Sequence, residues 1–367
     1  MKKILSVILI LTVILSAVSC SDAKYEPIPS TEEESRVLMA FNFEGEEYEL
    51  KYELYRALFL NHSRNYDGGD ASFWSTDAAN KAKEEINKKI VDLALDIFSV
   101  LHLSKKIGYD PYSNDAEEKI NEYIVQSVDG SETVVGFGGD YDAYLKYLRD
   151  MNLNYSVQVL LYRYSIAYDK VIEYYRGSAS ADAPNPDMQD GALEYKKSDV
   201  ENFYNGNDSV RISIIVFSEY MTLDKVKERR DAIVSKSGVE EALNYAVSFA
   251  ADTSEDASSD ILDGVVIGKN SMDSNYYSEV IDQAFSLEIG EFSPVISVST
   301  AKSTEYWVIC KREKTSGYLS DNFDDIKDAY VSDRIGEIIA NAKDAIGKTA
   351  SKTDAFINLD YSNIKMS

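Results

Sequence analysis

The sequence predicts an α+β protein in which a mostly helical part is interrupted by a compact block of mixed strands and helices. Apolar residues recur at three- and four-residue steps in two stretches that lie far apart in the chain, residues 79–101 and 326–342. Between them, residues 210–217 and 306–311 are rich in β-branched and aromatic residues, which is typical of strands. The order of these segments places an α+β block between two helical ones.

The first helical block is predicted to open with a short strand or a hairpin. Weak alternation ends at Glu44-Gly45-Glu46, which indicates a tight turn. In the longest helix we expect Thr76 as the N-cap and Gly108 as the stop signal. Helices are expected over residues 54–60, 76–107, 114–126, 140–150 and 154–176.

The mixed block follows a stretch rich in serine, alanine, glycine and proline, residues 177–191, which we interpret as a linker. A short helix is expected near residues 198–204. Strands are expected over residues 210–217, 265–267, 292–298 and 306–311, and helices over residues 222–235, 239–250 and 278–285. This gives the order β-α-α-β-α-β-β, with an acidic, solvated loop near residues 252–263. Helix returns over residues 325–346.

The charge balance disfavours nucleic acid as a partner. The 367 residues contain 38 Lys and Arg against 63 Asp and Glu, a formal net charge of −25. The negative electrostatic field of such a charge repels the phosphate backbones of nucleic acids. The 27 tyrosines suit surfaces that are partly in contact and partly wet.

The N-terminus resembles a bacterial lipoprotein signal. Two lysines precede an apolar run of residues 4–18, which is short for a membrane-spanning helix. The run ends at Ala17-Val18-Ser19-Cys20, a sequence similar to a lipobox. The resemblance implies a signal peptide over residues 1–19, lipid attachment at Cys20 and a polar tether over residues 20–35. The alternative is an ordinary secretory signal with a chance cysteine.

Several pieces of the mixed block together resemble a parvulin-type peptidyl-prolyl isomerase domain. The matching pieces are Ala251-Asp252-Thr253-Ser254, Gly268-Lys269-Asn270-Ser271-Met272, Ala284-Phe285-Ser286-Leu287 and Ile289-Gly290-Glu291-Phe292-Ser293-Pro294-Val295. Their order and spacing carry the resemblance, since each piece alone is a weak signal.

The helical part resembles the chaperone domain of extracytoplasmic foldases, the PrsA and SurA group, beginning at Phe43-Glu44-Gly45-Glu46-Glu47-Tyr48. In that group a parvulin domain interrupts the helical domain, and a last helix returns to complete it. The resemblance implies the N-terminal part of a chaperone domain over residues 36–176, a linker and short helix over 177–206, a parvulin-like domain over 207–314, and a returning helix and tail over 315–367.

The sequence departs from active parvulins at their reaction centre. The positions where the family carries two histidines correspond here to Ile214 and Trp307, and the Cys or Asp between them falls on Thr253. A family Ser or Thr corresponds to Thr304. No residue is therefore predicted to be catalytic.

Part of the apolar substrate pocket is retained according to the same resemblance. The residues assigned to substrate binding are Met272, Tyr276, Tyr277, Val280 and Phe285. The pocket aromatic of the family corresponds to Tyr276, or to Val280 if the extra residues of this chain are placed earlier.

The two histidines, His62 and His102, lie in the helical block, where His102 is expected to be a packed histidine and His62 to be exposed. Neither has the spacing of a metal ligand set or of a hydrolase triad, so no metal or cofactor is predicted. The tyrosines of residues 155–175 fit either a helical core with wet edges or a cradle for extended polypeptide.

The sequence thus predicts a lipid-anchored foldase or chaperone of the cell envelope whose partners are unfolded exported proteins and, through its lipid, the membrane. Its isomerase activity is expected to be weak or absent. Two alternatives remain: an active isomerase with an atypical pocket, and a lipoprotein that binds a small solute or acts as an adhesin. The oligomeric state is left open.

Overall fold

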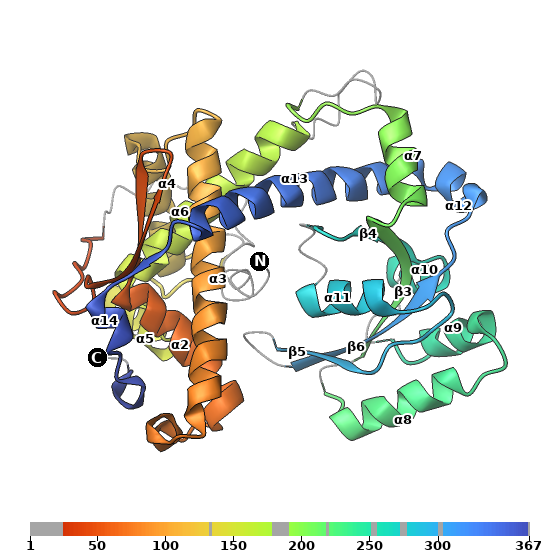
Figure 1. Ribbon diagram of the computed structural model, residues 1–367, viewed down its shortest axis with the longest axis horizontal. Helices are drawn as coiled ribbons and strands as arrows, with labels where there is room; N and C mark the ends of the chain where they lie inside the picture. Colours follow the sequence, from red (N-terminus) through yellow and green to blue (C-terminus); the bar gives the residue numbers. More distant parts are fainter. Residues whose placement is uncertain are drawn as a thin grey trace. The chain divides into compact units, whose positions relative to one another are not determined.

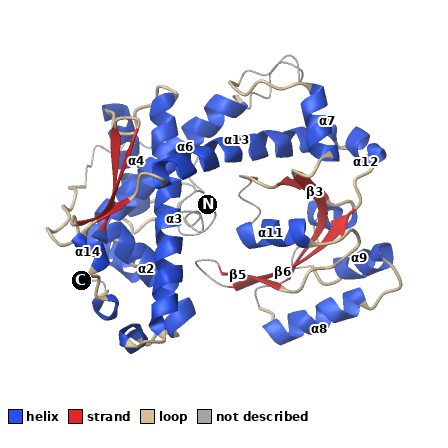
Figure 2. Cartoon of the chain, in the orientation of Figure 1, coloured by secondary structure: helices blue, strands red, loops and turns tan. Residues whose placement is uncertain are grey.

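The computed structural model describes residues 25–131, 134–177, 191–217, 220–250, 255–271, 277–299 and 304–365. The chain forms two compact units (Figure 1). The inserted unit comprises Tyr175–Ile338, and the outer unit comprises the described residues before and after it. Helices dominate, and the strands are confined to two small sheets (Figure 2). The predicted α+β class is confirmed.

The outer unit consists of a three-stranded antiparallel sheet of order β2-β1-β7 and helices. Its elements are β1 (Val37–Phe43), β2 (Glu46–Lys51), α2 (Tyr52–Asp67), η1 (Ala71–Ser75), α3 (Ala79–Lys106), α4 (Asn114–Asp129), α5 (Tyr141–Asp150), α6 (Tyr155–Arg176), the end of α13 (Phe323–Gly347), β7 (Ser351–Lys352), α14 (Asp354–Ile357) and η2 (Tyr361–Asn363). Glu44 and Gly45 connect β1 to β2 with φ of 51° and 84°, the left-handed pair that a two-residue hairpin requires.

Helix α3 is the central element of the outer unit. Residues 93–104 are all buried, so this half of the helix is covered on every side rather than on one stripe. Phe98 stacks on Tyr48 and contacts Phe41, which attaches the hairpin to the helix. The predicted N-cap at Thr76 is wrong, because its hydroxyl donates to the Phe73 carbonyl and ends η1 instead.

The C-terminal segment completes the outer unit. In α13, the amine of Lys343 lies 2.8 Å from carboxylate oxygens of both Asp92 and Asp96 in α3. Beyond the helix, β7 pairs with β1 through Met39↔Lys352 and Ala40↔Ser351. Segments more than two hundred residues apart in the sequence are therefore neighbours in one core.

The inserted unit contains a four-stranded antiparallel sheet of order β4-β3-β6-β5. Its elements are α7 (Lys197–Asn205), β3 (Ser209–Phe217), α8 (Leu223–Val234), α9 (Val239–Val247), α10 (Glu255–Leu262), β4 (Val265–Gly268), α11 (Ser278–Ser286), β5 (Ile296–Ser299), β6 (Thr304–Arg312), α12 (Ser316–Asp321) and the first part of α13. The predicted β-α-α-β-α-β-β order is found with one addition, α10, which occupies part of the expected acidic loop.

A group of buried residues extends the inserted unit beyond this sheet. Val200, Phe203 and Tyr204 of α7 pack with Val266 of β4 and Ile326 of α13. The division between the units consequently falls inside α13, at Ile338, whereas the sequence places a boundary at residue 314. The first half of α13 is held by α7 and β4, and only its last turns reach α3.

Candidate functional site

Strand β3 is buried on both faces and separates two apolar clusters. Val210, Ile212 and Ile214 face α11, while Ile215 and Phe217 face α8 and α9, because side chains alternate along a strand. Figure 1 shows α11 on one side of this sheet and α8 and α9 on the other. The α11 face carries the residues that the sequence singles out.

Ile214 and Trp307 lie on this face, on adjacent strands. Ile214 is opposite Ile309 and Trp307 is opposite Val216, so the two side chains are diagonal neighbours. Each is 7% exposed, and both belong to one buried cluster. The two positions that the resemblance assigns to histidines in active parvulins are therefore filled by packed apolar side chains.

The substrate-binding residues predicted on α11 join the same cluster. Val280 is fully buried within it, and Tyr277 and Phe285 pack against it while remaining partly exposed. The rings of Tyr277 and Trp307 meet edge to face, with centroids 5.5 Å apart. The structure thus brings together Ile214, Trp307, Val280, Tyr277 and Phe285.

The polar groups at this face are few. The Trp307 Nε1 donates to the Glu305 carboxylate at 3.1 Å. Burial, and then the nearby Glu305 charge, raises the pKa of Tyr277 to about 12, so its hydroxyl keeps its proton at neutral pH. The described side chains at this face are mostly packed apolar groups, and they include no group that exchanges a proton near neutral pH.

Other predicted positions lie outside the described residues: Cys20, Thr253, Met272 and Tyr276. Thr304 is described as the first residue of β6, half-buried and opposite Ser299 of β5. It is on the same strand as Trp307.

The opposite face of the sheet is apolar and unreactive. Cys310 is fully buried there with Val308 and Phe292. Burial raises the pKa of its thiol to about 12, which leaves very little of the nucleophilic thiolate at neutral pH.

Both histidines belong to the outer unit. His102 is 3% exposed, its Nδ1 lies 3.0 Å from the Tyr48 hydroxyl, and its Nε2 lies 3.4 Å from a Glu44 carboxylate oxygen. Burial, aided by Lys106, lowers its pKa, so it is a packed neutral histidine as expected. His62 is half-buried rather than exposed, because α2 continues past it to Asp67.

The tyrosines of α6 are mostly core residues. Tyr155, Tyr162 and Tyr164 are at most 7% exposed. Tyr168 is partly exposed, and Tyr174 is 45% exposed at the far end of the helix. The core interpretation therefore applies to most of the stripe, and no continuous tyrosine surface is formed by these residues.

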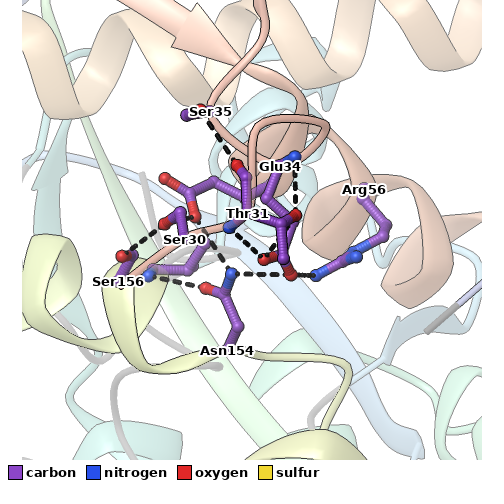
Figure 3. Close-up of polar contacts among 9 residues, drawn as sticks. Ser30, Thr31, Glu34, Ser35, Arg56, Asn154 and Ser156 are labelled. Atoms are coloured by element: carbon purple, nitrogen blue, oxygen red, sulfur yellow. Dashed lines mark hydrogen bonds and ion pairs between the residues drawn. The ribbon is translucent and has the colours of Figure 1, made fainter. Parts of the chain in front are cut away.

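A polar network joins the segment before β1 to α2 and to the start of α6 (Figure 3). Thr31 and Glu34 bond reciprocally, with the Thr31 N–H donating to Glu34 and the Glu34 N–H donating to the Thr31 hydroxyl. The Glu34 carboxylate also accepts from Arg56 at 2.7 Å and from Asn154 at 3.2 Å. The Ser30 hydroxyl lies 2.6 Å from that of Ser156. The sequence analysis missed this network, although the Thr-x-x-Glu spacing is a capping-box signal.

The sequence analysis also missed a pocket of about 490 Å³ in the outer unit. It is lined by residues of β2, α2, α3 and α6 and by Tyr112, which lies between α3 and α4. Three glutamates, Glu47, Glu49 and Glu53, and two cations, Lys51 and Arg163, border an apolar floor. The alternating glutamates of β2 were the only sequence feature of this pocket that a local pattern could have revealed.

In the described part of the chain, no three or more His, Cys, Asp or Glu side chains are grouped to hold a metal ion. None of the described helices combines the length and apolarity that crossing a membrane requires.

Comparison with solved structures returns foldases, whereas no family model and no curated protein matches the chain. The chain is similar to the foldase protein PrsA of Streptococcus pneumoniae (16% identity, 78% of this chain and 92% of that chain, TM-score 0.31). It is also similar to PrsA of Bacillus subtilis (14% identity, 86% and 93%, TM-score 0.24) and of Lactococcus lactis (12%, 90% and 100%, TM-score 0.23). All three of these solved structures are PrsA foldases.

Proposed function

We propose that the chain is an extracytoplasmic foldase-type chaperone that binds unfolded exported polypeptides, and that its parvulin-like block has weak or no isomerase activity. The observation that carries this proposal is the buried pair Ile214 and Trp307 on the α11 face. The motifs of residues 251–295 and the α+β block between outer-unit segments support the assignment to foldases.

The chemistry of prolyl isomerisation explains why this pair matters. Rotation about a peptide bond must cross a barrier of about 18 to 20 kcal/mol. A catalyst lowers it by binding the twisted amide better than the planar one, using polar groups placed around the bond. Packed apolar side chains such as Ile214 and Trp307 offer no such polar groups, and apolar contacts that bind both states equally do not accelerate the reaction.

Two assays on the full mature chain test the proposal. The chain should suppress the aggregation of a chemically unfolded client in proportion to its concentration. In a refolding reaction limited by prolyl isomerisation, it should leave the slow phase unchanged. Strong acceleration of that phase would overturn the degenerate-isomerase part of the proposal.

The same assays separate the alternatives. An active isomerase with an atypical pocket predicts acceleration that is lost when Tyr276 or Thr253 is substituted. A solute-binding or adhesive lipoprotein predicts no suppression of aggregation, together with saturable binding of one small ligand or of a surface.

We also propose that Cys20 carries a lipid that holds the protein at the outer face of the membrane. The support is the sequence from Lys2 to Cys20, because diacylation supplies the two chains that stable anchoring needs. Cell fractionation tests it: the Cys20→Ala protein should leave the membrane fraction, and its retention there would contradict the anchor.

A further inference from the structure

The pocket of the outer unit lies along the free edge of β2. Among the described strands, β2 has only β1 as a neighbour. Glu47, Tyr48 and Glu49 all line the pocket, although consecutive side chains of a strand point to opposite faces. A pocket that touches all three residues must lie beside the strand rather than over one of its faces.

The hairpin register determines which main-chain groups face that edge. Glu46 pairs with Phe43 across the two-residue turn, and hydrogen-bonded pairs alternate with non-hydrogen-bonded pairs along an antiparallel ladder. The N–H and C=O groups of Glu47 and Glu49 therefore point away from β1. Such an edge can accept an extended peptide as an additional strand.

The far wall of the pocket carries apolar side chains. It is formed by α6, where Val159 and Leu160 are partly exposed, and by Tyr112, a residue that is 51% exposed and whose ring has the Arg163 guanidinium 4.4 Å from its centroid. A segment lying between β2 and α6 could place every second side chain against this wall, on the same face as the buried Tyr48.

The other side chains of such a segment would meet negative charge. Glu47 and Glu49 share the opposite face of β2, and both are at least partly exposed. The guanidinium of Arg163, one of the two cations at the pocket, is already paired with Glu117 at 2.6 Å. Only Lys51, 3.7 Å from Glu49, remains to offset the glutamates.

We propose that the groove between β2 and α6 binds an extended polypeptide segment in which basic residues alternate with apolar ones, by adding that segment to β2 as a strand. The basic side chains meet Glu47 and Glu49, and the apolar ones meet Leu160 and Tyr112. The inference rests on the proposed chaperone function, since an unfolded client exposes such segments.

The test uses the full mature chain and a fluorescent peptide in which lysine alternates with valine. Anisotropy should report binding that weakens as salt is added. Glu47→Lys combined with Glu49→Lys should weaken it by about tenfold, because the charge contacts become repulsive. The matched control, Glu84→Lys with Asp142→Lys, makes the same change in net charge at exposed positions away from the pocket and should bind like the wild type.

Three altered peptides test the binding mode without changing the protein. Glutamate in place of lysine should abolish binding. N-methylation of every second peptide amide keeps the charge but removes hydrogen-bond donors. Methylation of the amides that face β2 should abolish binding, and methylation of the other set should not. Equal binding of all these peptides would overturn the strand-addition proposal.

Three outcomes distinguish this proposal from its alternatives and from the proposed function. Sedimentation showing a dimer that the Glu47→Lys and Glu49→Lys variant dissociates would mean that the edge pairs with a second copy, and the proposal would be wrong. If the wild type suppresses client aggregation but peptide binding is unaffected by this variant, only the groove is refuted. Absence of suppression by the wild type would refute the proposed function itself.

Discussion

At the level of single residues, Glu34 shows how a buried charge is stabilised by its partners. Burial alone would raise its pKa, but hydrogen bonds from Thr31, Arg56 and Asn154 lower it to about 2. Arg56 is itself only 3% exposed, so each charge of this pair depends on the other.

We therefore expect Glu34→Gln to destabilise the outer unit by about 3 kcal/mol at neutral pH, since it leaves the buried Arg56 without its counter-charge. The pKa of Glu34 is lower in the folded chain than in the unfolded chain. The contribution of the Glu34 carboxylate to the free energy of unfolding is thus complete above about pH 4.5, and it is lost as the pH falls toward about 2. Urea unfolding across this range measures the effect.

Exposed Glu32, two residues away, supplies the matched control for that experiment. Glu32→Gln should leave the unfolding midpoint unchanged at every pH. If the two variants behave alike, the network of Figure 3 contributes nothing measurable to stability.

Residue-level predictions from the sequence succeeded where local pattern decides the outcome. The packed state of His102 follows from its place between Leu101 and Leu103 in a long amphipathic helix. The Glu34 network could not be anticipated in full, because Arg56 and Asn154 are distant in sequence and only the folded chain brings them to Glu34.

At the level of elements, α13 is attached to β4 by a close contact. The Asp333 carboxylate accepts the Asn270 N–H at 2.6 Å. A β-carbon at Gly268 would lie 2.4 Å from the Asp333 Oδ1, so only glycine leaves room for this carboxylate. The contact holds the first part of α13 within the inserted unit.

Asp333 makes this contact dependent on pH. Burial is the largest influence and raises its pKa to about 6, against the opposing effects of Asn270 and Arg334. The folded chain then binds the proton more tightly than the unfolded one, so stability falls as the pH rises from about 4 to about 6.

Asp333→Asn should remove that dependence and stabilise the inserted unit by about 2 kcal/mol above pH 6, because the amide oxygen can still accept the Asn270 N–H without a buried charge. Thermal unfolding of the wild type and of Asp333→Asn at pH 4.5 and 7.5 measures this difference in stability. Lower stability of Asp333→Asn at both values would show that the charge itself is needed.

The sequence located most elements but not their three-dimensional partners. Hydrophobic periodicity and residue composition predicted α3, α6 and β3, because each of these is a local pattern. The short β7 and α14 were missed, since a two-residue strand is recognisable only through its pairing with β1. Ile214 and Trp307 lie in one buried cluster on adjacent strands, whereas the groove beside β2 depends on α6 and could not be predicted from local sequence.

At the level of the whole molecule, the outer unit depends on residues that follow the inserted unit. Four large side chains from this segment are buried: Ile339, Ile346, Phe356 and Ile364. Their burial is worth about 10 kcal/mol, which is comparable with the entire stability of a typical domain. The inserted unit, Tyr175–Ile338, does not include any of them.

Removing residues 339–367 should therefore unfold the outer unit and leave the inserted unit folded. The two tryptophans report the units separately, because Trp74 is buried in the outer unit beside Tyr361 and Trp307 is buried in the inserted sheet. In a Trp307→Phe background the truncation should shift the emission of Trp74 to the red. In a Trp74→Phe background the emission of Trp307 should stay where it is in the full-length chain. A shift of both would mean that the inserted unit cannot fold without the returning segment, and a shift of neither would mean that the segment is dispensable to the core around Trp74.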